Sequence, residues 1–144
     1  MINGINSREM ILEILLEIEE GEHSHVAIRN ALSKYQFLPK QDRAFITRVC
    51  EGTLEYRIQI DYIINSFSKV TVDKMKPAIR EILRSAVYQL KYMDSVPDSA
   101  VCNEAVKLAQ RKGFYNLKPF VNGVLRTIAR EMDRVRFPQK KMIC

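Results

Sequence analysis

Residues Phe120–Arg130, FVNGVLRTIAR, carry the helical pattern from which the fold can be argued. Apolar side chains recur there at steps of three and four, which is typical of a helix with one buried face. The residues of that face are Phe120, Val121, Val124, Leu125 and Ile128. Gly123 interrupts the pattern, although glycine costs about 1 kcal/mol relative to alanine inside a helix. We expect Gly123 to admit a neighbouring backbone or a large side chain, so that Gly123→Leu would overpack the C-terminal lobe.

Prolines and glycines divide the rest of the chain into further helices. Proline suits the first turn of a helix and glycine commonly ends one. The prolines at predicted starts are Pro39, Pro77, Pro97 and Pro119, and the glycines at predicted ends are Gly21 and Gly113. Asn6 with Glu9 three residues later is typical of a capping box for the first helix. We predict that Ser24 caps the second helix.

The third predicted helix is long, from Pro39 to Phe67, and Gly52 inside it indicates a close helix crossing or a kink. The segment 68–74, SKVTVDK, breaks the pattern, so we place a lobe boundary near residues 68–76. No alternating apolar pattern is long enough for a strand. The sequence therefore predicts one all-α domain over residues 1–144, a bundle of about six to seven helices in two three-helix lobes with a tail from about residue 137.

Composition limits the class of protein. No apolar run reaches the roughly 20 residues of a membrane span, and no secretory signal opens the chain. Cys50, Cys102 and Cys144 are widely spaced, which suits a reducing cytoplasm and argues against a disulfide framework or a zinc site. We assign His23 and His25 to a surface loop rather than to a metal site. The expected location is the cytoplasm.

Charge is unevenly distributed along the chain, which has a net charge of +6. Residues 1–34 hold three basic and six acidic residues, whereas residues 100–144 hold ten basic and three acidic residues. A one-sided basic region fits a polyanionic partner, and a solvated basic surface without a partner is the alternative. Phe114 and Tyr115, in KGFYNLK, could stack on bases or pack on the core.

Residues for catalysis are not evident. No glycine-rich loop follows a strand, and no histidine accompanies a serine or cysteine nucleophile pattern. We interpret Glu13 and Glu17 as solvated, because catalytic carboxylates need burial to separate their pKa values. The sequence predicts neither an active site nor a bound metal or cofactor.

Three segments together resemble the NusB-like RNA-binding family, over about residues 6–136. They are DRAFITRVCEGTLEYRIQIDYII, ILRSAVYQLKYMDSVPDSAVCNEAVKLA and FVNGVLRTIAR. The resemblance implies one of two branches. One is the stand-alone antitermination factor, which binds boxA RNA together with ribosomal protein S10. The other is the N-terminal domain of a small-subunit rRNA cytosine-C5 methyltransferase.

Details of the sequence favour the methyltransferase branch. GTLEYR followed by Asp61 resembles that branch, as does Arg126 in VNGVLR, and only Arg8 replaces the arginine-rich helix start of the antitermination factors. The catalytic domain and its S-adenosylmethionine site would lie outside this chain, so we expect no methylation by the chain alone.

The resemblance also implies an RNA-binding surface that joins the start of the first helix to the loop before the last one. That implies contacts to RNA from Arg8, Lys118, Phe120 and Arg126, and charge placement adds Lys107, Arg111 and Arg130. A third possibility is a helical interaction domain without RNA. Its docking face would be the acidic side of the first helix, at Glu9, Glu13, Glu17 and Glu20.

Overall fold

A computed structural model describes residues 6–135 and 137. Over these residues the chain forms seven α-helices and three short 3₁₀ helices, which confirms the all-α prediction. The α-helices are α1 (Ser7–Glu19), α2 (Ser24–Lys34), α3 (Lys40–Glu55), α4 (Arg57–Phe67), α5 (Pro77–Tyr92), α6 (Asp98–Arg111) and α7 (Lys118–Glu131). The 3₁₀ helices are η2 (Val72–Lys74), η3 (Tyr115–Leu117) and η4 (Met132–Arg134). Residues 138–144, which hold most of the predicted tail, lie outside the described part.

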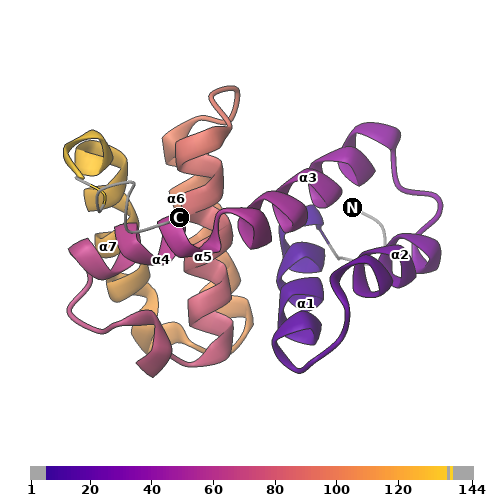
Figure 1. The fold of residues 1–144 in the computed structure, drawn as a ribbon, viewed down its shortest axis with the longest axis horizontal. Coiled ribbons are helices and arrows are strands. Elements are labelled where there is room, and N and C mark those ends of the chain that lie inside the picture. The colour runs from indigo at the N-terminus through magenta and orange to yellow at the C-terminus, as the bar shows by residue number, and fades with distance from the viewer. Residues whose placement is uncertain (1–5, 136, 138–144) are drawn as a thin grey trace.

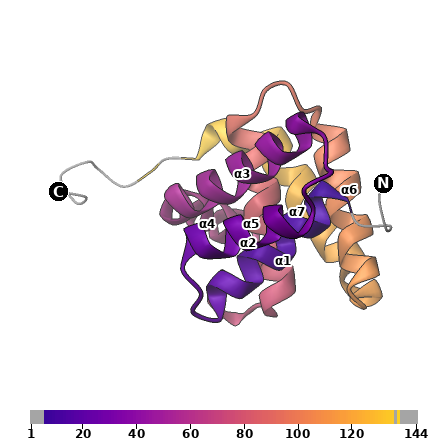
Figure 2. The ribbon, with the colours of Figure 1, turned by 90° about the vertical axis from the view of Figure 1, so that its right-hand side faces the viewer.

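The helices form two groups that meet at α5 (Figure 1). Helices α1, α2 and α3 pack on one another, and α4, α6 and α7 pack around α5. Helix α1 also packs directly on α5, so that one continuous hydrophobic core runs through both groups. Figure 2 shows α6 and α7 side by side, and they are in extensive contact.

The predicted long third helix is in fact two helices, which meet at Tyr56. Tyr56 is both the C-cap of α3 and the N-cap of α4, with φ −103° and ψ 21°. Helix α4 then packs against α5 and α7, so the second group has four helices. The change of group therefore falls at Tyr56 rather than near residues 68–76, which link α4 to α5 within one group.

Gly52 is a close crossing point rather than the kink. A Cβ atom added to Gly52 would overlap the aromatic ring of Tyr88 on α5. Tyr88 and Gly52 are both buried, so the absent side chain lets α3 and α5 approach closely. Of the two readings that the sequence left open, the structure supports the crossing.

Helix ends follow most of the predicted signals. The Asn6 side chain accepts a hydrogen bond of 2.8 Å from the backbone N–H of Glu9, as a cap should. Gly21 and Gly113 end α1 and α6 with φ of +115° and +89°, values that favour glycine. The prediction for Ser24 is wrong. His23 is the cap of α2, because its carbonyl already accepts from the N–H of Ala27 at 3.0 Å.

The packing role predicted for Gly123 is also wrong. Gly123 is exposed, and an added Cβ atom would meet no atom of the described residues within 4 Å. The predicted buried stripe is correct for Val121, Val124, Leu125 and Ile128, and Gly123 lies away from it. Because α7 makes its interhelical contacts through the stripe, a leucine at position 123 would extend into solvent and would not overpack the lobe.

Candidate nucleic-acid interface

The α6–α7 pair carries a row of amide and cationic side chains, which we call the α6–α7 row. Its members are Asn103, Gln110, Lys118, Asn122 and Arg126. At its centre, Arg126 donates from Nε to Asn122 Oδ1 at 3.0 Å and from Nη2 to Asn103 Oδ1 at 2.7 Å. Asn122 lies one turn earlier on α7, and Asn103 lies on α6. Both acceptors are neutral, so they hold the guanidinium in place without cancelling its charge. Two of its five N–H donors are used, and three stay available to an anion.

Lys118 is held in a similar way at the start of α7. Its Nζ donates to the amide Oε1 of Gln110 on α6 at 2.8 Å. The same ammonium lies 4.6 Å from the ring centroid of Tyr115, which is a cation–π contact. A positive charge and an exposed aromatic ring therefore meet at the start of α7.

Three other predicted cations each have a carboxylate partner. The ion pairs are Lys107–Glu104 at 3.5 Å, Arg111–Glu9 at 3.3 Å and Arg130–Glu131 at 3.3 Å. Lys112, beside Arg111, also pairs with Glu9 and Glu13 on α1. Several of the basic residues counted in the sequence thus have a carboxylate beside them. Among the predicted cations of α6 and α7, Lys118 and Arg126 have no carboxylate partner within the described residues.

Arg8 stands apart from this row. It is half-buried, donates from Nη2 to Gln89 Oε1 at 3.0 Å and lies 5.2 Å from the ring centroid of Phe45. Burial lowers the pKa of its guanidinium. The ion pair between Arg111 and Glu9 does bring the start of α1 to the end of α6, as the predicted surface requires. Arg8 itself, however, points into the junction of α1, α3 and α5.

The aromatic candidates divide by exposure. Tyr115 is 63% exposed and can offer a ring face to a base. Phe114 and Phe120 are partly buried and pack against the core, which leaves less of their rings for stacking. The sequence named Tyr115 but could not separate it from Phe114, because both follow Gly113 in the same loop.

Asn103 and Gln110 are the residues that sequence reasoning missed. Neither has a distinctive local pattern. Asn103 orients Arg126, which is 23 residues away along the chain, and Gln110 orients Lys118, which is 8 residues away. Their spacing of seven, like that of Lys118 and Arg126 at eight, places side chains on one face of a helix. That spacing was the only available signal, and it becomes meaningful once α6 and α7 are known to run antiparallel.

The described residues offer no constellation for chemistry. Cys50 and Cys102 are buried, and burial raises the pKa of both thiols, which disfavours the reactive thiolate. No group of three or more His, Cys, Asp or Glu side chains in the described part could hold a metal ion. None of the described helices is long and apolar enough to span a membrane.

The sequence profile of the NusB family matches residues 5–130. The chain belongs to the NusB family. The resemblance noted from the three segments is therefore confirmed. The match covers every α-helix except the last residue of α7, and it includes the whole α6–α7 row.

Relatives from both branches of the NusB family are similar to the chain. A probable ribosomal RNA small subunit methyltransferase B of Bacillus subtilis (strain 168) is 32% identical over 139 residues, with 94% of this chain but 31% of the relative covered. The chain thus spans less than a third of that protein. Transcription antitermination protein NusB of Dictyoglomus thermophilum is 33% identical over 130 residues, with 90% of this chain and 85% of the relative covered. These identities do not separate the two branches.

Solved structures of NusB share the fold. NusB of T. maritima is 26% identical with a TM-score of 0.78, and the match covers 96% of this chain and 95% of that one. Antitermination factors NusB and NusE, solved in complex with dsRNA, include a chain that matches with a TM-score of 0.78 at 21% identity. That match covers 86% of this chain and 93% of the other, and it supports the fold alone.

Proposed function

We propose that this chain is an RNA-binding domain that holds small-subunit rRNA for a cytosine-C5 methyltransferase domain outside the sequence given. The observation that carries the proposal is the state of Lys118 and Arg126. Within the described residues both are oriented by neutral amides, whereas the neighbouring cations Lys107 and Arg111 are paired with carboxylates. A phosphate binds best where a cation is already positioned and not yet neutralised.

The row suits a single strand or a loop of RNA. Lys118 and Arg126 lie eight residues apart on α7, about two helical turns, which is roughly 11–12 Å. That span accommodates two phosphates of a strand lying along the helix pair. Between them, amide groups of Asn122 and Gln110 offer donors and acceptors to base edges, and Tyr115 offers a ring for stacking.

Binding would be the whole contribution of this chain. The likeness to the methyltransferase of Bacillus subtilis covers 31% of that protein, so catalysis and the S-adenosylmethionine site would belong to the remainder. The two cysteines of the described residues, Cys50 and Cys102, are buried and offer no exposed thiol nucleophile. We infer that the chain alone does not methylate RNA.

A NusB-type antitermination factor is the second candidate function. The observation that favours it is the likeness to NusB of Dictyoglomus thermophilum, of which 85% is covered. In this reading the same α6–α7 row would bind boxA RNA, and ribosomal protein S10 would be a partner. The orientation of Arg8 toward Gln89 weighs against it, because the start of α1 then offers RNA few contacts.

RNA binding as a function of salt tests both functions. A small-subunit rRNA hairpin and a boxA RNA would be titrated with the wild type and with the double variant Lys118→Gln, Arg126→Gln. We expect the rRNA hairpin to bind more tightly. In the double variant we expect at least tenfold weaker binding and a salt slope smaller by about 0.7 for each lost phosphate contact of a single strand.

The matched control is Lys107→Gln with Arg130→Gln, which removes the same amount of charge from the α6–α7 pair. Because both cations have carboxylate partners, we expect a loss of less than threefold. Equal losses in the two double variants would contradict the assignment of the row. A preference for boxA RNA that added S10 strengthens would establish the second function instead.

A further inference from the structure

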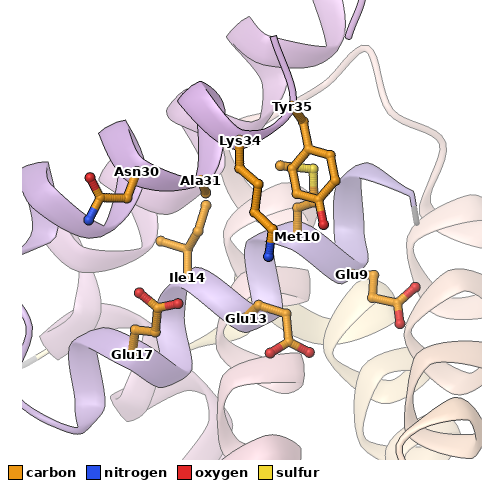
Figure 3. A pocket seen from close by; sticks show the side chains of 9 residues that line it. All are labelled: Glu9, Met10, Glu13, Ile14, Glu17, Asn30, Ala31, Lys34 and Tyr35. Carbon is orange, nitrogen blue, oxygen red and sulfur yellow. The ribbon is translucent and has the colours of Figure 1, made fainter. Parts of the chain in front are cut away.

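A groove between α1 and α2 lies outside the proposed RNA-binding row. Its volume is about 330 Å³. The buried side chains of Met10 and Ile14, with Ala31, form an apolar floor. Figure 3 shows the carboxylates of Glu9, Glu13 and Glu17 standing along α1, while Lys34 and Tyr35 reach across from α2; Asn30 completes the lining.

The rim of this groove is acidic on a basic protein. Glu9, Glu13 and Glu17 follow at four-residue steps and therefore share one face of α1. Glu20, Gly21 and Glu22 lie beside Glu17 on the same exposed surface. The acidic surface thus continues past the groove to the end of α1, on a chain whose net charge is +6.

The acidic surface of α1 forms ion pairs at its N-terminal end and has unpaired carboxylates at its C-terminal end within the described residues. Lys112 of α6 pairs with Glu9 and Glu13, and Arg111 pairs with Glu9. Within the described residues, no Lys or Arg side chain lies within 4 Å of the Glu17 or Glu20 carboxylate, although both residues are exposed. The uncompensated negative charge is therefore concentrated beside the apolar floor and beyond it.

We propose that the α1–α2 groove docks a short basic segment of a partner protein. One apolar side chain of the segment would rest on Met10, Ile14 and Ala31. Its flanking lysine or arginine side chains would pair with Glu17 and Glu20. Lys34 and Asn30, on the opposite wall, would donate hydrogen bonds to backbone carbonyl groups of the segment.

The charge of the groove selects this occupant over the others. An RNA strand would bring phosphates against Glu13 and Glu17, which is unfavourable. A polyamine could pair with the carboxylates but would leave the apolar floor uncovered. A protein segment with both kinds of side chain uses the floor, the acidic rim and the donors of α2 together.

Two amphipathic peptides test the docking surface. The probe is a labelled twelve-residue peptide of leucine and lysine, titrated by fluorescence anisotropy at physiological salt. Its comparison peptide has every leucine replaced by serine. We expect the leucine–lysine peptide to bind at least tenfold more tightly than the serine–lysine peptide. Equal binding, or no binding of either peptide, would overturn the proposal.

Variants of the protein localise the binding. Glu17→Gln removes a rim charge without breaking an ion pair within the described residues, and we expect at least fivefold weaker binding of the leucine–lysine peptide. Glu55→Gln, an exposed glutamate at the end of α3, is the matched control and should change binding less than twofold. A similar loss in both variants, or full competition by spermine, would show general cation binding and contradict the docking site.

RNA titration separates this proposal from the proposed function. Glu17→Gln should leave rRNA binding unchanged, because Glu17 lies on α1 away from the α6–α7 row. Lys118→Gln with Arg126→Gln should in turn leave peptide binding unchanged. Loss of RNA binding in Glu17→Gln would indicate one shared surface and would contradict two separate sites.

Discussion

Gly123 lies in the second turn of α7, where its missing side chain faces solvent. In the part of the chain that the structure describes, neither a neighbouring backbone nor a large side chain occupies that space. The glycine is therefore a cost to the helix that packing does not offset. It adjoins Asn122 and lies three residues before Arg126, which places bare helix backbone beside the proposed RNA-binding row.

Substitution of this glycine should separate stability from binding. We expect Gly123→Ala to increase the free energy of unfolding by about 0.5–1 kcal/mol, since alanine favours the helix and its Cβ meets nothing. Urea unfolding checks this. If the bare backbone serves RNA, the same variant should bind the rRNA hairpin more weakly. A destabilised Gly123→Ala would show that the position has a packing role after all.

Glu81 is a buried carboxyl group, 3% exposed, in a cluster with an excess of acid. The cluster holds three carboxyl groups, of Glu19, Asp61 and Glu81, and two guanidinium groups, of Arg80 and Arg84. Burial, with a hydrogen bond to Glu19, raises the pKa of Glu81 to about 8. The hydrogen bond from Arg80 lowers the pKa of Glu19 to about 2. One proton on Glu81 balances the charges.

Stability should therefore fall as pH rises toward 8. The folded-state pKa of Glu81 lies above its unfolded value of about 4.3. The contribution of protonated Glu81 is fully present below the unfolded pKa and is lost as pH rises through the folded pKa. We expect Glu81→Gln to flatten the decline of unfolding free energy between pH 5 and 8, measured by urea unfolding at several pH values. An unchanged decline would contradict this assignment.

At the scale of the elements, the α3–α5 crossing depends on one absent side chain. Gly52 faces the ring of Tyr88, and Tyr88 belongs to an aromatic stack with Tyr92 and Tyr56. The ring centroids of Tyr56 and Tyr92 lie 4.4 Å apart. Tyr56 is also the residue at which α3 ends and α4 begins. The crossing and the break between the two helices are thus parts of one packed region.

Enlarging Gly52 should disturb this region. We expect Gly52→Ala to lower the free energy of unfolding by about 1–3 kcal/mol, the usual range for overpacking. The reason is that the ring of Tyr88 cannot keep its position beside an added Cβ atom. Thermal unfolding measures the loss. In a Tyr88→Ala background the added methyl group has room, so the loss caused by Gly52→Ala should be smaller there. Equal losses in both backgrounds would show that the Tyr88 contact is not the cause.

At the scale of the whole molecule, the two groups of helices are joined by polar as well as apolar contacts. Glu19 at the end of α1 pairs with Arg80 of α5 at 2.6 Å and with Arg84 of α5 at 3.8 Å. The carboxylates on α1 also take up Arg111 and Lys112 at the end of α6. The acidic N-terminal region thus neutralises part of the basic C-terminal region.

The sequence by itself determined the all-α class, most helix ends and the buried stripe of α7. Apolar periodicity, proline and glycine are local signals, which can be interpreted without knowing the tertiary contacts of the segment. The tertiary structure alone decided where α3 ends, what Gly52 and Gly123 do and which cations stay unpaired. Those outcomes depend on contacts between residues far apart in the chain, such as Arg126 with Asn103 and Arg111 with Glu9. Basic residues can be counted in a sequence, but whether each one lies beside a carboxylate depends on how the helices pack.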